Sequence, residues 1–418
     1  MGNAVYAACQ WGMLVVLAKL GSPEMVGEFT LGLAITAPIF MFSNLQLRHI
    51  QATDAKQRYV FSDYFGLRVI STVMALGVVV AIVLIGRYVP QEPLTIEACL
   101  TILLMGLAKA FESVSDVLYG LIQQRERMDR IAISLMIKGP LSLLTLGLGI
   151  YLTGNLLWGM IGLAVSWGVV AFGYDLQSGK AILSLMKLEP SNEPNVPRKS
   201  FSIRPRWQIN TLKKLVLLAF PLGLVMLLIS LNVNIPRYFV ERYLGPQELG
   251  FFAALAYLMV AGSMVVNALG QSATPRLAKY YATGNSNAFG QLLLKLIGIG
   301  AALGIVAVSV AIVAGEQVLT LFYDAEYAEY ANLFAWLMVA AGISYISSFL
   351  GYGMTAAQYF QVQMPLFTLS TTVSALTSFW LIPKLGLQGA AIALIAGAIV
   401  EAIFSLGVNL YAIHKIKR

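Results

Sequence analysis

The chain has very few of the residues that build disulfide frameworks, metal sites or water-exposed surfaces. Of its 418 residues, two are cysteine, two are histidine and 11% are charged. Cys9 and Cys99 fall in apolar stretches and His49 and His414 are isolated, so neither a disulfide framework nor a metal site is indicated. No Walker motif is present, which argues against ATP as the direct energy source.

Long apolar runs fill the chain instead. Hydrophobic residues make up 58% of it and the mean hydropathy is +0.75, more than a soluble globular protein needs. Helices satisfy their own backbone hydrogen bonds in lipid, and each run is long enough to span a bilayer. The sequence therefore predicts an all-α polytopic membrane protein with about twelve spans, near residues 4–20, 27–47, 68–88, 94–122, 131–152, 156–178, 213–241, 248–271, 291–314, 328–356, 363–383 and 387–412.

The basic residues predict the orientation of these spans. If the N-terminus is inside, 22 of the 28 basic residues fall on the inner side, and the six exceptions are Lys19, Arg87, Lys109, Arg237, Arg242 and Lys384. Inner connections carry the excess of Lys and Arg in membrane proteins. Residues 4–20 have no basic segment before them and are interpreted as an uncleaved first span. Both termini are therefore predicted to be cytoplasmic.

The second half of the chain repeats features of the first. Three motifs recur in order at separations of 224 to 233 residues: LGSPEMVG at 20–27 with LGPQELG at 244–250, YG at 119–120 with 352–353, and GMIG at 159–162 with GLQG at 386–389. The first and third pairs fall on the outer side in both halves, which indicates a parallel repeat about an axis along the membrane normal.

This repeat predicts two lobes of six helices. We expect an N-terminal lobe at 1–180, a cytoplasmic linker at 181–212 and a C-terminal lobe at 213–418. The linker holds four prolines, and residues 201–215 mix basic and aromatic side chains. That mixture suits a helix on an anionic inner leaflet, and a solvated basic linker explains it equally well.

The fourth span carries charge on one helix face. Lys109, Glu112 and Asp116 are three and four residues apart, so they point the same way. Charge within a membrane is costly and usually faces the interior of a bundle. Two interpretations remain open: a polar wall of a central cavity with a protonatable carboxylate, or an internally neutralised cluster near the cytoplasmic side.

The seventh span carries the strongest candidate for binding an anion. Pro236 is expected to kink the helix, and Arg237 follows it, with Asn234 and Glu241 on nearly the same face. A guanidinium can donate two parallel hydrogen bonds to a pair of phosphate oxygens. The alternative is an Arg237–Glu241 pair near the outer end. Arg48 lies at the inner end of the second span. It either lines the cytoplasmic entrance of the cavity or simply follows the excess of basic residues on the inner side.

Two further acids and a glycine pair complete the intramembrane features. Asp175 and Glu401 lie late in the sixth and twelfth spans, where either could titrate in a proton- or sodium-coupled cycle, and neither is assigned a role. No other cofactor is indicated. Gly300 and Gly304 have the GxxxG spacing of closely packed helices.

Several short segments resemble the polysaccharide-export, or O-antigen flippase, family of the multidrug/oligosaccharidyl-lipid/polysaccharide exporter superfamily. They are LGSPEMVGEF at 20–29, NIPR at 234–237 with LGPQELG at 244–250, PRLA at 275–278, YAEYA at 327–331 and PKLGLQGAA at 383–391. The chain departs from the family by starting almost directly in the first span. It also has Asn232 and Asn234 where many relatives carry an acid.

The resemblance implies two six-helix lobes around a central cavity, alternating access, and a polyprenyl-pyrophosphate-linked oligosaccharide as cargo. It also implies a bacterial inner membrane and, as partners, a polysaccharide polymerase and export machinery. Cavity cations of such flippases are thought to meet the pyrophosphate. Arg237 matches this role best, with Lys109 and Arg48 next, and the protonatable candidates are Glu112, Asp116 and Glu241.

Two rival functions follow from the same pattern. The first is a multidrug/cation antiporter of the superfamily, which shares the fold and should have a carboxylate-rich, aromatic cavity. The lipid II flippase branch is closer still to the proposed family, but it typically carries two more helices, for which this chain has no room. An integral membrane polymerase or glycosyltransferase usually needs a large outer loop, whereas the outer loops here are short and the longest polar stretch is inside. We therefore expect a transporter and not an enzyme.

Overall fold

The computed structural model describes residues 1–54, 58–89, 93–188 and 202–417. Within these ranges the chain is helical and contains no strand, and twelve helical stretches are long and apolar enough to cross a membrane. The prediction of an all-α polytopic membrane protein with about twelve spans is confirmed. The chain divides into unit 1, Met1–Gly21 with Leu31–Leu227, and unit 2, Ser22–Thr30 with Leu228–Arg418.

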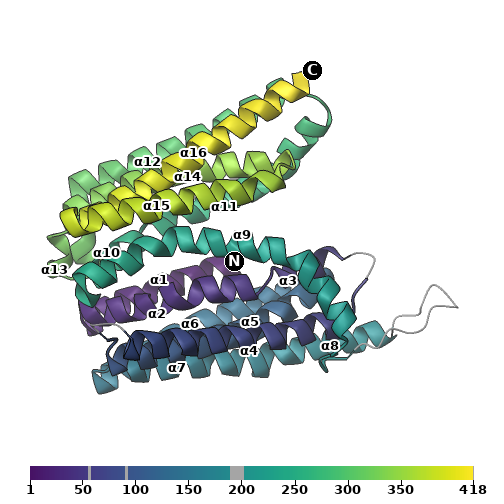
Figure 1. Ribbon diagram of the computed structural model, residues 1–418, viewed down its shortest axis with the longest axis horizontal. Helices are drawn as coiled ribbons and strands as arrows, with labels where there is room; N and C mark the ends of the chain where they lie inside the picture. Colours follow the sequence, from purple (N-terminus) through teal and green to yellow (C-terminus); the bar gives the residue numbers. More distant parts are fainter. Residues whose placement is uncertain (55–57, 90–92, 189–201, 418) are drawn as a thin grey trace. The chain divides into compact units, whose positions relative to one another are not determined.

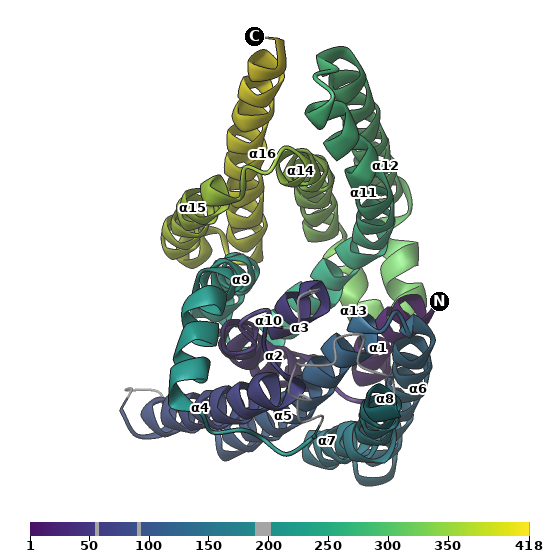
Figure 2. The ribbon, with the colours of Figure 1, turned by 90° about the vertical axis from the view of Figure 1, so that its right-hand side faces the viewer.

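Unit 1 is built from the helices of the first half. α1 packs on α6, α6 packs on α7, and α5 contacts both α4 and α7 (Figures 1 and 2). A single π-helical turn, η1, joins α7 to α8. The helices of this half are α1 (Gly2–Leu20), α2 (Pro23–Ser43), α3 (Leu47–Thr53), α4 (Phe61–Tyr88), α5 (Ile96–Gln124), α6 (Met128–Thr153), α7 (Leu156–Val170), η1 (Ala171–Asp175) and α8 (Leu176–Leu188).

Unit 2 contains the helices of the second half, together with the first turns of α2. α14 packs between α12 and α16, and α15 packs on α16 (Figure 2). α9 begins in unit 1, enters unit 2 at Leu228 and continues through Pro236 as one helix. The helices are α9 (Ile209–Leu244), α10 (Pro246–Tyr257), α11 (Met259–Ala282), α12 (Ser286–Phe322), α13 (Ala325–Ala328), α14 (Ala331–Ala356), η2 (Phe360–Val362), α15 (Gln363–Leu385) and α16 (Leu387–Lys417).

Local sequence signals explain where several helices begin and end. Thr95, Asn155 and Asn285 each precede a helix, and their side chains accept hydrogen bonds from backbone N–H groups of the first turn. Gly154 and Gly386 follow α6 and α15 with φ of 65° and 60°, a left-handed conformation that glycine adopts without a Cβ clash.

Small residues allow the close helix packing expected of the GxxxG segment. A Cβ added to Gly304 would lie 2.6 Å from the Cα of Gly342 on α14, and one added to Gly300 would lie 3.1 Å from the ring of Phe349. Large apolar side chains point outward instead, as Val313 does at 81% exposure. Small residues inside and apolar residues outside suit helices packed in lipid, where the surroundings are as apolar as the core.

The structure corrects the inner end of the second span. Leu45 and Gln46 have φ of 50° and 51°, so α2 ends at Ser43 and a short helix, α3, begins at Leu47. Arg48 therefore lies on α3 and does not close a continuous helix. A pattern of apolar residues cannot locate this break, because left-handed non-glycine residues are stabilised by their tertiary surroundings.

The expected linker is helical at both described ends. Residues 181–188 continue α8, and residues 209–212 begin α9. Between them, the segment from Ser202 is tied to the start of α4: Arg206 N donates to Ser62 O at 3.0 Å, and Ser62 Oγ donates to Ser202 O at 2.7 Å. Residues 189–201, with three of the four linker prolines, lie outside the described residues. The division into two six-helix lobes remains a prediction.

Candidate functional site

The membrane-spanning helices of unit 2 line a partly open cavity of about 650 Å³. Its walls come from α9, α10, α11, α14, α15 and α16. Among the described residues that line it, the charged ones are Arg237 on α9 and Glu401 on α16. The cavity therefore offers one cation and one carboxylate within an otherwise neutral wall.

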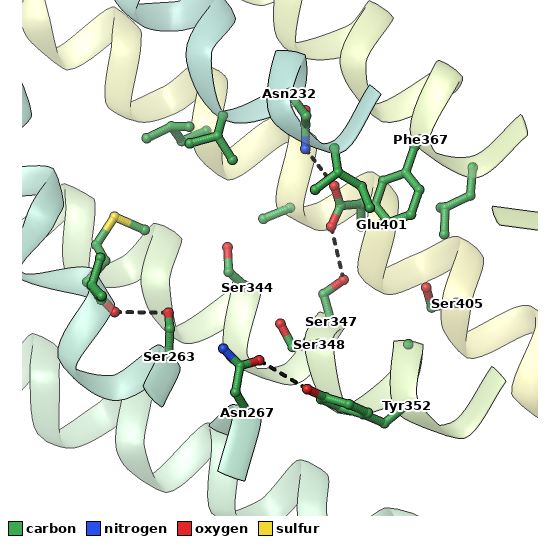
Figure 3. A pocket seen from close by; sticks show the side chains of 18 of the residues that line it. Asn232, Ser263, Asn267, Ser344, Ser347, Ser348, Tyr352, Phe367, Glu401 and Ser405 are labelled. Atoms are coloured by element: carbon green, nitrogen blue, oxygen red, sulfur yellow. Dashed lines mark hydrogen bonds between the residues drawn. The ribbon is translucent and has the colours of Figure 1, made fainter. Parts of the chain in front are cut away.

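Glu401 is held by hydrogen bonds from three helices (Figure 3). Asn232 Nδ2 donates to Oε1 at 2.6 Å, Ser370 Oγ donates to the same oxygen at 3.0 Å, and Ser347 Oγ reaches Oε2 at 3.5 Å. Ser370 also lies 3.2 Å from Asn232 Oδ1. Because these partners come from α9, α14 and α15, the carboxylate connects four helices of unit 2 at the cavity wall.

Arg237 is only partly engaged. Its Nη1 donates to Asn234 Oδ1 at 2.9 Å, and the buried Asn234 in turn donates from Nδ2 to the carbonyl oxygen of Ser230 at 2.8 Å. Among the described residues no carboxylate lies within ion-pair distance of Arg237, so the alternative of an Arg237–Glu241 pair is wrong. Glu241 is not among the residues lining the cavity. The guanidinium thus retains donors for an anionic ligand.

The rest of the wall is rich in hydroxyl and amide groups. Tyr352 donates to Asn267 Oδ1 at 3.1 Å, and Ser344 and Ser348 lie on the same side of the cavity in Figure 3. Hydroxyl and amide groups both donate and accept hydrogen bonds. A wall of this kind can replace the hydration of a neutral polar ligand such as a sugar.

Unit 1 contains a second charged region, on α5. Glu112 accepts from Lys109 Nζ at 2.8 Å, from Lys138 Nζ at 3.5 Å and from Tyr6 OH at 3.2 Å. Lys138 is 2% exposed and its Nζ lies 4.0 Å from the ring centroid of Trp167, a favourable cation–π contact. Glu112 thus faces two cations, and because Lys109 and Glu112 are both partly exposed, the cluster reaches a surface.

One helical turn further along, Asp116 is shared by two arginines. The fully buried Arg68 bonds to it at 2.8 Å and also bonds to Asn44, while Arg48 Nη1 lies 4.0 Å from it. Arg48 donates from Nε to Gln123 at 3.1 Å. The tight buried pair anchors Asp116, and the long pair leaves Arg48 available to other anions.

The predicted face of α5 thus carries two adjacent ion-pair groups. Arg237 and Glu241 lie in unit 2, whereas Lys109, Arg48, Glu112 and Asp116 lie in unit 1. Three important residues were missed: Arg68 and Lys138 were counted with the inner connections, and Glu401 was left without a role. Arg68 is the first residue of its predicted span, whereas Lys138 and Glu401 lie within theirs. A cation four residues inside an apolar run, such as Arg68, was the available signal.

Comparison with known proteins identifies the family. A model of the polysaccharide biosynthesis protein family matches residues 2–281. The chain belongs to this family. It is 31% identical over 398 residues to the capsular polysaccharide biosynthesis protein CapF of Staphylococcus aureus, covering 94% of this chain and 92% of that one. The family resemblance read from the sequence is confirmed.

Solved structures of transporters share the fold. An inward-facing multidrug resistance MATE family transporter of the MOP superfamily matches with a TM-score of 0.74 at 14% identity, covering 98% of this chain and 94% of that one. Lipid II flippase MurJ, in an inward closed conformation, matches with a TM-score of 0.70 at 12% identity, covering 100% of this chain and 89% of that one. At such identities the likeness concerns the fold.

Proposed function

We propose that this protein is a flippase that carries a polyprenyl-pyrophosphate-linked oligosaccharide across the bacterial cytoplasmic membrane by alternating access. No bond is made or broken in this task. The observation that carries the proposal is Arg237, a cation without a carboxylate partner among the described residues, in a polar cavity within membrane-spanning helices. Arg237 is partly exposed, and its guanidinium retains hydrogen-bond donors that an anion entering the cavity can engage.

The composition of the two polar regions supports this cargo. A pyrophosphate needs strong donors, which guanidinium and ammonium groups supply, and a sugar needs hydroxyl and amide partners, which the serine-rich wall of unit 2 supplies. In unit 1 the cluster around α5 adds four cations against two carboxylates: Arg48, Arg68, Lys109 and Lys138 with Glu112 and Asp116. Arg237, Lys109 and Arg48 are the proposed contacts for the pyrophosphate, and Glu112, Asp116 and Glu241 the proposed protonatable groups.

A multidrug/cation exporter is the second candidate, because one observation favours it. Glu401 is a carboxylate in the cavity wall, and Phe252, Tyr257, Tyr352 and Phe367 line the same space. A carboxylate surrounded by aromatic rings can bind an organic cation. The two candidates make opposite demands on the cavity charges: the flippase depends on Arg237, and the exporter depends on Glu401.

Flipping by purified protein in liposomes tests the proposal. Fluorescent polyprenyl-pyrophosphate oligosaccharide is placed in both leaflets, and an impermeant quencher reports the exposed fraction. Wild-type protein should remove the protected fraction. An Arg237→Gln variant should flip about tenfold to a hundredfold more slowly, since a hydrogen bond to a charged group contributes about 1.5–3 kcal/mol.

The matched control is Arg242→Gln, five residues further along the same helix, exposed and outside the cavity lining. It should flip as wild type does. Equal rates for Arg237→Gln and wild type would remove Arg237 from the mechanism. Absence of flipping with several glycans, together with efflux of a cationic dye that Glu401→Gln abolishes, would establish the exporter.

A further inference from the structure

Asp175 is the last residue of the π-helical turn η1, and it is completely buried. Neither of its carboxylate oxygens has a hydrogen-bond partner among the described residues. π-Helical turns inside α-helices often mark functional positions, because they carry one extra residue that local packing must stabilise. A buried carboxyl group without a partner requires a physical explanation.

The groups around Asp175 come from α5 and α6. The hydroxyls of Ser115, Ser134 and Tyr119 and the ammonium of Lys138 lie next to the carboxyl group. Ser115 Oγ is itself buried without a hydrogen-bond partner. Tyr119 OH and Ser134 Oγ lie 2.6 Å apart. Three buried polar atoms without partners, two of Asp175 and one of Ser115, therefore meet at this position.

Lys138 does not explain these atoms. Among the described residues its ion pair is with Glu112, at 3.5 Å, and its Nζ lies over the Trp167 ring. Glu112 in turn also pairs with Lys109. An ionised Asp175 would be a buried charge with only neutral hydroxyl groups as close neighbours and no ion pair of its own, at a cost of several kcal/mol. A protonated Asp175 carries no charge and has one O–H that a neighbouring hydroxyl such as Ser115 can accept.

We propose that Asp175 is a proton-binding site whose carboxyl group exchanges one proton with the polar face of α5 through Ser134 and Tyr119. Tyr119 lies at the end of this path, since Arg48 Cζ is 5.4 Å from the centroid of its ring and the Arg48 side chain is 28% exposed. The path therefore leads from a closed position to the group of ion pairs around Asp116.

Coupling of this proton to transport rests on the proposed flippase function, whereas the proton site itself does not. Uptake of a proton removes the negative charge of Asp175 next to Lys138 and so makes unit 1 more positive by one charge. An added positive charge strengthens the attraction of this region for an anionic cargo. Release of the proton reverses the effect, so the site can link a proton gradient to cargo release.

Difference infrared spectroscopy of the purified protein in nanodiscs tests the site without any cargo. The carbonyl-stretch band of a protonated carboxylic acid should appear in the wild type at neutral pH. It should be missing in Asp175→Asn and should move in D₂O because the proton exchanges. Asp129→Asn, which removes an exposed carboxylate on α6, is the matched control and should leave the band unchanged.

Ser115→Ala provides an independent variant in case Asp175→Asn does not fold. Loss of the acceptor should shift the frequency of the same band. Identical spectra for the wild type and both variants would overturn the proposal, because Asp175 would then be ionised. Disappearance of the band when sodium replaces choline at constant pH would overturn it in favour of a sodium site.

Transport provides the second readout. In the liposome flipping assay, a proton gradient should accelerate the wild type severalfold and should leave Asp175→Asn unaffected. If the infrared band is present and no flipping occurs with any glycan, the proton site stands and the flippase function fails. If flipping occurs and the band is absent, the flippase function stands and the proton site fails.

Discussion

Arg68 is a fully buried guanidinium that depends on two partners. It bonds to Asp116 and to Asn44, and Asn44 also accepts a hydrogen bond from Ser113 at 2.9 Å. Removing one member of a buried ion pair leaves the other charge without compensation, which costs more than the pair itself contributes. The buried side of the α5 cluster is therefore where a single substitution should affect stability most.

Asp116→Asn should destabilise the protein by about 3–5 kcal/mol, because it leaves Arg68 as an uncompensated buried charge. Thermal unfolding in detergent, followed by circular dichroism, measures the effect. The control is Asp129→Asn, whose partner Arg127 is exposed with it. It should cause no measurable change. Equal melting temperatures for the two variants would show that Arg68 does not depend on Asp116.

At the level of helices, the glycines of the two repeated motifs at 20–27 and 244–250 lie against one another. A Cβ added to Gly27 on α2 would lie 1.8 Å from the carbonyl oxygen of Pro246, and a Cβ added to Gly250 on α10 would lie 1.9 Å from that of Pro23. In each motif the proline begins a helix, and the glycine leaves room for the backbone of the other motif's proline. Both segments belong to unit 2.

Gly27→Ala and Gly250→Ala should each lower the melting temperature, since either Cβ forces the backbones of α2 and α10 apart. The double variant should lower the melting temperature by less than the sum of the two single effects, because both substitutions disrupt one shared contact. Gly77→Ala on α4 is the control. An added Cβ there meets nothing within 4 Å, and replacing a helical glycine should be neutral or stabilising by up to about 1 kcal/mol. Strictly additive effects would refute the shared contact.

For the whole molecule, the distribution of positive charge predicts one orientation in the membrane. If the N-terminus is inside, 22 of the 28 basic residues fall on the inner side, which would also hold both chain ends. Arg68 and Lys138 are among these 22, and the structure shows that they are buried in ion pairs. They therefore contribute to the interior of unit 1 and not to a basic inner surface. The remaining bias is still strong.

Reporter fusions test this orientation. Green fluorescent protein should fluoresce at both the N- and the C-terminus, because it folds in the cytoplasm. Alkaline phosphatase, which is active only outside, should be active when inserted near Asp324, between α12 and α13, which the predicted topology places on the outer side. An active phosphatase fused to either terminus would contradict the predicted topology.

The sequence by itself determined the fold class, the number of spans, the repeat and the family. Each of these depends on features that continue over many residues, namely apolar runs of membrane length and motifs that recur at a nearly constant separation. Arg237 could also be identified as a candidate, because a cation following a proline within an apolar run is conspicuous without any structure.

The tertiary structure alone decided which charges are paired. Lys109 and Glu112 share a helix face, and their contact could be expected, but the partners of Asp116 and Glu401 come from other helices. Such pairings depend on how helices rotate and cross, which short-range patterns do not specify. The same reason explains the buried Asp175, whose isolation from hydrogen-bond partners is a property of the packed helices around it.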